Sequence, residues 1–221
     1  MSLDGAAESV ETVESRALLA LAAGDREQAA TLMLREHGPE VSRFLAALHR
    51  DPDDAAEVFS AFAEALWKSV ASFEGRSSVR TWMFAVARRV SLRYRRDERR
   101  RRKRFQPLPE GSALLAVEAQ LRTATLSFLK TERRSKLTAL RESLPVEDQM
   151  LLMLRVDRKL AWNELAVVLS EAEGDDDVRA ALAEDAQKRE AARLRKKFQL
   201  LKERLRELGR REGLIGGDDT Q

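Results

Sequence analysis

Apolar residues recur every three or four positions over most of this chain, which is the spacing of an amphipathic α-helix. The clearest case follows Asp51-Pro52-Asp53-Asp54, where a capping acid and further carboxylates predict a helix start. Its apolar stripe continues as far as Phe73. A second helix is predicted over Val79–Arg96, with Ser78 as its cap and Trp82 on its buried face. The pattern therefore predicts an all-α protein.

Less regular segments precede this pair of helices. Gly38-Pro39 interrupts the apolar pattern, so we expect two short helices there, at Arg26–His37 and Pro39–Arg50. Met1–Ser15 is small, polar and acidic, and we expect it to be disordered or weakly helical within an acidic, partly disordered tail at residues 1–24.

Prolines and glycines mark a boundary after the second predicted helix. Phe105–Ser112 contains Pro107, Pro109 and Gly111 and is the clearest linker in the chain. The apolar segment Ala113–Leu129 is predicted to be a helix that packs on either side of this boundary. We expect two small helical domains, at residues 25–105 and 131–212, joined by a linker at 106–130 and followed by a tail at 213–221.

The second domain has its own series of predicted helices. They cover Lys136–Leu144, Pro145 to about Val156, Leu160–Leu169 and about Ala186–Arg211. In the last of them, apolar residues at heptad a/d spacing from Ala191 to Leu208 predict one buried seam. A helix, a connection at Glu171–Gln187 and a long helix with a basic outer face have the layout of a helix-turn-helix.

Basic residues gather in two islands. Gly75–Arg104 holds 13 Lys and Arg against two acids, a net charge of +11, and Lys188–Glu212 holds 11 against four, a net charge of +7. The whole chain carries only +3, so the remainder is acidic. Cations concentrated in this way favour two binding sites for a polyanion. A solvated coiled-coil face is the alternative for the second island, but Arg195, Lys196 and Lys197 crowd together without a compensating acid.

Composition argues against catalysis and membrane insertion. The chain has no cysteine, which excludes disulfides and thiolate metal sites. Its two histidines, His37 and His49, have no ligand or nucleophile at a useful spacing, so we expect surface or packing roles, no metal, no cofactor and no enzyme activity. No apolar run approaches the ~20 residues of a bilayer span, and the N-terminus lacks the layout of a signal peptide. We expect a cytoplasmic protein.

One segment has a specific resemblance. Phe73–Arg89 is F-E-G-R-S-S-V-R-T-W-M-F-A-V-A-R-R and runs into the arginine-rich helix end. It resembles the pattern F-x-G-R-S-S-[FL]-R-T-W-L-x-x-I-A-R-N of bacterial RNA polymerase sigma factors of the extracytoplasmic-function (ECF) class, with Arg89 in place of the usual Asn. Leu144-Pro-Val-Glu-Asp-Gln and Leu160-Ala-Trp-Asn-Glu-Leu-Ala are similar to the family's L-P-x-E-x-R and L-S-x-x-E-I-A.

The resemblance implies a protein that binds core RNA polymerase, recognises promoter DNA and supports promoter opening. In the family, the first domain docks on the clamp helices of the largest polymerase subunit and captures an unstacked base of the minus-ten element. The second domain docks on the duplex of the minus-thirty-five element and meets the flap of the second-largest subunit. The family also allows an anti-sigma factor as a partner, which the sequence does not identify.

The resemblance assigns these roles to individual residues. The minus-ten contacts fall on Arg76, Ser77, Ser78, Arg80, Arg88, Arg89, Arg93 and Arg96. The minus-thirty-five contacts fall on Arg193, Arg195, Lys196, Lys197, Gln199 and Lys202. The polymerase contacts fall on Asp54, Glu57, Ser60, Ala61, Glu64 and Lys68, with Ser60-Ala61 in place of the family's Gln-Glu pair.

Two other functions stay open at this point. A stand-alone helix-turn-helix regulator would use the second basic island on duplex DNA, but it leaves the first island without a role. A polybasic membrane-surface protein would insert the apolar seam of residues 191–208 between lipid headgroups.

Overall fold

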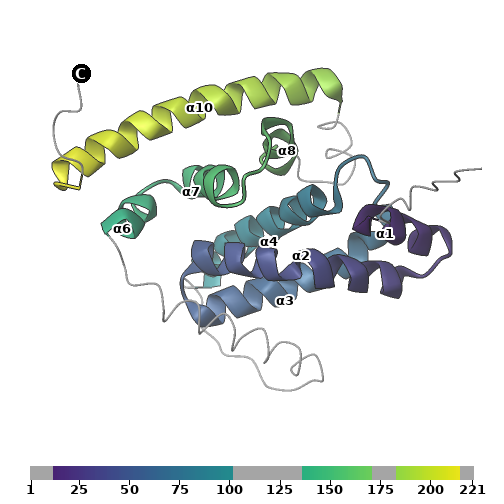
Figure 1. The fold of residues 1–221 in the computed structure, drawn as a ribbon. Coiled ribbons are helices and arrows are strands. Elements are labelled where there is room, and N and C mark those ends of the chain that lie inside the picture. The colour runs from purple at the N-terminus through teal and green to yellow at the C-terminus, as the bar shows by residue number, and fades with distance from the viewer. Residues whose placement is uncertain (1–11, 102–135, 171–182, 215–221) are drawn as a thin grey trace, which may run out of the picture.

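The computed structural model describes residues 12–101, 136–170 and 183–214. Every regular element in these ranges is a helix, which confirms the predicted all-α class. The helices form two layers (Figure 1). The first layer contains α1 (Val13–Ala22), α2 (Arg26–His49), α3 (Pro52–Ser69), the short η1 (Val70–Ser72) and α4 (Val79–Arg101). The second contains α6 (Lys136–Glu142), α7 (Val146–Leu152), η2 (Met153–Asp157), α8 (Trp162–Val168) and α10 (Glu184–Arg211).

Helix α3 begins where its carboxylates predict. The Asp51 side chain accepts hydrogen bonds from the backbone N–H groups of Asp53 and Asp54, at 2.9 and 3.1 Å. The predicted apolar stripe is buried, with Phe62 and Leu66 fully enclosed between α2 and α4. Burying these large side chains, at ~1.5–3 kcal/mol each, holds α3 in the first layer.

Helix α2 corrects one prediction. It runs unbroken from Arg26 to His49 with Pro39 inside it, so the expected pair of short helices is wrong. Proline removes one backbone hydrogen bond and costs ~3 kcal/mol or more in a helix interior. Val41, Phe44 and Leu45 follow it and are completely or almost completely buried, and each contributes ~1.5–3 kcal/mol. The free energy gained by burying these side chains therefore exceeds the cost of Pro39 in the helix.

Helix α1 is a second difference from expectation. It lies within residues 1–24, which were expected to form an acidic tail. The part of this tail that the structure describes contains a capped helix. The Thr12 hydroxyl oxygen accepts from the Ser15 N–H at 3.2 Å, and Ala17 and Ala20 are buried where α1 packs on α2. Small alanines allow α1 to approach α2 closely.

The second layer follows the predicted helices closely. The seam of α10 is buried at Ala191, Leu194 and Leu201, as the heptad spacing predicts. Helix α10 begins at Glu184, so it takes in the last residues of the connection predicted at 171–187. The rest of that connection from 171 to 182, the linker at 106–130 and the helix at 113–129 lie outside the described residues.

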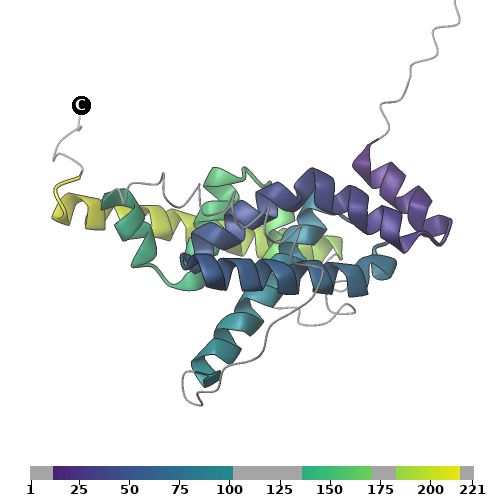
Figure 2. The same ribbon diagram turned by 90° about the horizontal axis from the view of Figure 1, so that it is seen from below.

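The two layers meet where α4 crosses α8 (Figure 1). Only the first half of α4 is covered in this way, because its C-terminal end projects from the body of the molecule (Figure 2). Among the described helices, none has the length and apolar character needed to cross a bilayer.

Candidate nucleic-acid interface

The loop before α4 is built around Gly75. Its φ of 70° lies in the left-handed region that favours glycine, and a Cβ there would come within 2.9 Å of Cδ1 of Leu18 in α1. Ser78 then caps α4 as predicted, because its hydroxyl oxygen accepts from the Thr81 N–H at 3.1 Å. The loop is therefore held at both ends, by α1 and by its own cap.

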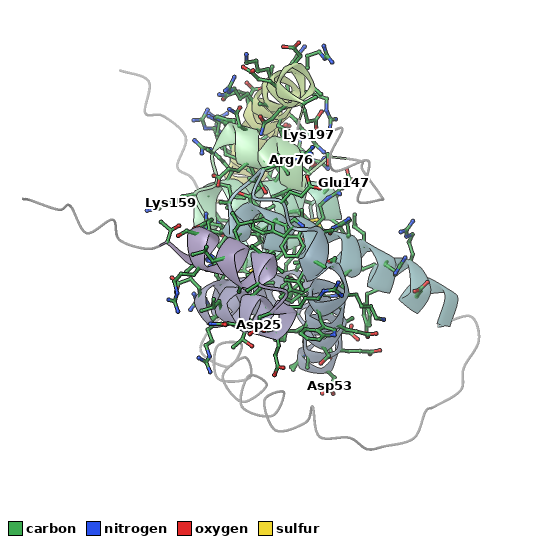
Figure 3. All side chains as sticks on the ribbon, turned by 90° about the vertical axis from the view of Figure 1, so that its right-hand side faces the viewer. Asp25, Asp53, Arg76, Glu147, Lys159 and Lys197 are labelled. Atoms are coloured by element: carbon green, nitrogen blue, oxygen red, sulfur yellow. The ribbon has the colours of Figure 1, made fainter. Side chains whose placement is uncertain are left out.

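Arg76 is an exposed residue of the loop before α4. Its side chain is 53% exposed, and it pairs with Glu74 at 2.8 Å (Figure 3 labels Arg76). An exposed pair of this kind is worth ~0–1 kcal/mol, so a phosphate or base can replace Glu74 at little cost. Ser77 is half-buried and donates to the Ser78 carbonyl over a long 3.4 Å.

Arg80 faces the protein instead. Its guanidinium binds the Glu40 carboxylate of α2 through two nitrogens, and it donates to the carbonyl oxygen of Arg158 at 2.6 Å. The hydrogen bonds that Arg80 donates to the Glu40 carboxylate raise the pKa of Arg80. Burial tends to raise the pKa of Glu40, but the hydrogen bond and charge of Arg80 outweigh it, and the pKa of Glu40 is lowered. Both shifts describe a charge-assisted pair that is fully ionised.

Arg88 lies deeper still. The residue is 7% exposed, and its Nη1 donates to the carbonyl oxygen of Ser170 at 2.8 Å. Farther along α4, Arg89 is half-buried, while Arg93 and Arg96 are exposed on the half of the helix that α8 does not cover. The predicted minus-ten residues thus fall into an open group and a covered group.

The predicted minus-thirty-five residues are mostly open. Arg193, Arg195, Lys196 and Gln199 are exposed on α10, whereas Lys197 and Lys202 are half-buried. Lys197 pairs with Asp148 of α7 at 2.9 Å. Figure 3 shows the side chains of α10 standing out around the helix at one extreme of the molecule.

Trp162 of α8 anchors this long helix. Its ring stacks edge-on against Phe198, with the ring centroids 5.6 Å apart. The guanidinium of Arg155 lies 4.7 Å from the ring centroid and that of Arg195 lies 5.9 Å from it. The Gln187 amide also donates to the carbonyl oxygen of Asn163 at 3.2 Å. The pair α8–α10 is therefore fixed by contacts at two points.

The predicted polymerase-binding residues share the outer side of α3. Glu64 and Lys68 are exposed and pair with each other. Asp54 and Glu57 both accept from the hydroxyl of Tyr94 in α4, at 2.8 and 3.0 Å. Ser60 and Ala61 are half-buried. Sequence reasoning missed Trp67 on this helix, which is 51% exposed although it is the largest apolar side chain there.

His49 has the packing role that its sequence context predicts. Its Nε2 lies 2.7 Å from the Ser91 hydroxyl, and its ring stacks edge-on against Tyr94. Burial, reinforced by the nearby charge of Arg95, lowers the pKa of His49 to about 4. In the parts of the chain that the structure describes, acidic side chains and histidines form no cluster that could hold a metal ion.

Three further residues bear on the interface and were not predicted. Glu40 accepts from Arg80 of α4, and Thr81 of the same helix donates its hydroxyl proton to Glu164 at 2.9 Å. In the sequence, Glu40 is 40 residues from Arg80, and Glu164 is 83 residues from Thr81. Nothing in the local sequence signals contacts over such separations.

Residues 33–101 match a family model described as Sigma-70 region 2. Comparison with curated proteins found no match, and comparison with solved structures found none either. The matched segment runs from Met33 in α2 to the end of α4 and includes the Gly75–Ser78 loop. It supports a sigma factor of the sigma-70 family, whose region 2 takes part in core polymerase binding and promoter melting. Helices α6 to α10 lie outside the matched residues.

Proposed function

We propose that this chain is a sigma factor of the ECF class, which binds core RNA polymerase, recognises promoter DNA and supports promoter opening. The observation that carries the proposal is the Sigma-70 region 2 match at residues 33–101, which contains the F-E-G-R-S-S-V-R-T-W segment. The protein would act in the cytoplasm and leave bond formation to the polymerase.

Opening would start at the loop before α4. Arg76 presents an exposed guanidinium beside two serine hydroxyls, and guanidinium and hydroxyl groups can hold phosphate and the edge of an unstacked base. Arg93 and Arg96 continue the basic track along the projecting half of α4. Capturing a flipped base would offset the few kcal/mol that its unstacking costs.

Duplex recognition would belong to residues 131–212. Helices α8 and α10 would act as a helix-turn-helix, with Arg193, Arg195 and Lys196 toward the phosphates and base edges. The contacts of Trp162 with Arg195 and Phe198 support this assignment, because they give α10 a fixed orientation on α8.

Polymerase docking would use the outer side of α3. Glu64 and Lys68 are exposed there, and Tyr94 holds the carboxylates of Asp54 and Glu57 in place. Trp67 adds an exposed aromatic side chain next to them, a residue type enriched at the energetic centres of protein interfaces. We propose the polymerase clamp helices as the partner of this side.

The test is reconstitution with purified core RNA polymerase. The full chain should co-purify with the polymerase and direct transcription from a subset of a genomic fragment library. A stand-alone helix-turn-helix regulator is the alternative, favoured by the open basic surface of α10. It would bind duplex fragments but would neither associate with the polymerase at low salt nor start transcription.

A further inference from the structure

Positive charge gathers where the turn before α8 meets α2. Arg80 donates to the carbonyl oxygen of Arg158 in this turn at 2.6 Å and also binds Glu40 of α2, so the turn lies against α2. Arg43 stands three positions after Glu40, on the same face of α2, and its charge acts on Arg158. Lys159 follows Arg158 and is exposed (Figure 3). We call Arg43, Arg158 and Lys159 the cationic junction.

The acids beside the cationic junction are already paired with other residues. Glu40 accepts from two nitrogens of Arg80, and Asp157 pairs with Arg141 at 3.1 Å. Within the parts of the chain that the structure describes, the three cations of the junction form no ion pair. The junction therefore concentrates positive charge that the protein itself does not neutralise, which attracts anions.

Arg158 has unused capacity to donate hydrogen bonds. The residue is half-buried, and its Nε is buried without a hydrogen-bond partner among the described residues. Burial lowers the pKa of Arg158, and the charge of Glu40 opposes this effect without outweighing it. A buried N–H group without an acceptor is rare and costs free energy. A bound anion would supply both the acceptor and the compensating charge.

The backbone at Lys159 is held in an unusual conformation. Its φ of 56° lies in the left-handed region, which side chains other than glycine's adopt at a cost. The turn is fixed on both sides, because the Arg158 N–H donates to the Met153 carbonyl at 3.0 Å and Arg155 donates to the Leu160 carbonyl at 2.7 Å. A lysine kept where glycine would be unstrained indicates a use for its ammonium group.

We propose that the cationic junction is a binding site for a small anion that carries two or more phosphate groups, either free pyrophosphate or the diphosphate of a nucleotide. Guanidinium groups hold phosphate oxygens in pairs, and an ammonium adds a compact point charge. A single carboxylate would neutralise only one of the three cations. Because Arg158 is half-buried between α2 and the turn, the site favours a compact free anion over the backbone of a duplex. None of the three residues belongs to the predicted DNA or polymerase contacts.

The test uses pyrophosphate as the probe and the full chain as the protein. Binding is measured by isothermal titration calorimetry and by thermal unfolding, in magnesium-free buffer with the ionic strength held constant by sodium chloride. Arg158→Met removes the half-buried guanidinium of the junction. Arg26→Met makes the same change at an exposed arginine at the start of α2 and serves as the control.

The wild type should bind pyrophosphate more tightly than orthophosphate, and its Tm should rise by about 4 °C at a pyrophosphate concentration of about ten times Kd. Arg158→Met should weaken pyrophosphate binding by about tenfold, as expected when charge-assisted hydrogen bonds are lost. Arg26→Met should bind like the wild type. Duplex affinity should be the same in all three proteins, because the exposed bases of α10 are unchanged.

Lys159 allows a test that separates binding from folding. Lys159→Gly removes the ammonium and also relieves the left-handed backbone, so without the anion it should unfold at a temperature at least as high as the wild type. Its affinity for pyrophosphate should nevertheless fall by about tenfold. Lys159→Arg keeps the charge and should retain the wild-type affinity within about twofold.

Three results would overturn the site. The first is pyrophosphate binding that survives both Arg158→Met and Lys159→Gly. The second is binding that is lost instead in Arg195→Ala with Lys196→Ala, which would place the anion on α10. The third is an Arg158→Met variant that loses duplex affinity but keeps pyrophosphate binding, since the phosphates would then be those of DNA. If Arg158→Met does not fold, Arg43→Met removes an exposed member of the junction, and an unchanged affinity in that variant would equally reject the site.

This outcome is independent of the proposed function. Transcription by the reconstituted polymerase together with no pyrophosphate binding would reject the anion site and keep the sigma factor. Pyrophosphate binding that depends on Arg158, in a chain that does not associate with the polymerase, would keep the site and reject the sigma factor.

Discussion

The two basic islands of this chain carry similar charge but differ in what that charge contacts. On α4, Arg80 and Arg88 bind a carboxylate or a backbone carbonyl from distant parts of the chain. On α10, Arg193 pairs with Glu190 of the same helix, and its side chain remains 57% exposed. A run of cations in a sequence thus predicts where positive charge is concentrated, and only the tertiary contacts show which part of it a ligand can reach.

The largest effect should come from the open island. Arg195→Ala with Lys196→Ala should weaken duplex binding by about 2 kcal/mol, roughly thirtyfold in Kd, because two exposed cations are lost. The slope of log affinity against log salt should flatten by about 2. Titrations at several salt concentrations measure both. Arg26→Ala with Arg35→Ala removes two exposed cations from α2 as a control. An unchanged salt slope would mean that α10 does not lie on DNA.

Acid should destabilise the layer that contains α4. His49 stays neutral in the folded chain down to a pKa of about 4 but gains a proton near pH 6.5 when unfolded, so stability is lost as the pH falls through this window. The loss between pH 7 and pH 5 should be about 2 kcal/mol.

Urea unfolding of the wild type and of His49→Gln measures this effect. The glutamine amide can still hydrogen-bond Ser91 but does not titrate, so the variant should lose clearly less stability over the same interval. Helix α10 contains no histidine. An equal loss of stability in the wild type and in His49→Gln would mean that a group other than His49 causes the acid sensitivity.

Promoter opening should depend on the loop before α4, which contains Arg76 and Ser77. Arg76→Ala with Ser77→Ala should slow opening by about tenfold, as expected when one base loses its contacts. Duplex and polymerase binding should be unchanged, because the surfaces proposed for them lie on α10 and α3. Permanganate footprinting of the minus-ten region measures the opening. Normal permanganate reactivity with the double variant would remove this loop from the mechanism.

The smallest effect should be the difference in stability lost when one ion pair is broken in each basic island. Glu40→Gln should lower the free energy of unfolding by about 1–2 kcal/mol, because it leaves the Arg80 guanidinium poorly compensated in a half-buried site. Glu190→Gln breaks an exposed pair on α10 and should cost less than about 0.5 kcal/mol. Thermal or urea unfolding of both variants checks the pair. Equal losses would show that the two islands do not differ in how firmly their arginines are held.

Local features of this fold were predictable from the sequence. The Asp51 cap, the buried stripe of α3 and the seam of α10 depend on neighbours within a few residues, and the structure confirms all three. The break expected at Gly38-Pro39 did not occur, because burial of Phe44 and Leu45 exceeds the cost of one proline. Propensity alone cannot weigh that balance.

The covered side of α4 was not predictable for a different reason. Arg88 and Ser170 are 82 residues apart, and their contact depends on how two layers of helices are placed. The amphipathic pattern shows which face of each helix is apolar, but it does not show which helix meets which. A motif therefore gives the positions of candidate site residues along the chain but not their accessibility, and their roles stay a prediction.

Gly75 has a practical consequence for anyone shortening this protein. Leu18 fills the space beside it, and Oε1 of Glu14 accepts from the Val79 N–H at 3.3 Å, so α1 supports the entry to α4 from outside the segment 33–101. A fragment trimmed to that segment would lose both supports. The loop before α4 would adopt conformations that the intact chain excludes. DNA binding measured on such a fragment would not represent that of the intact chain.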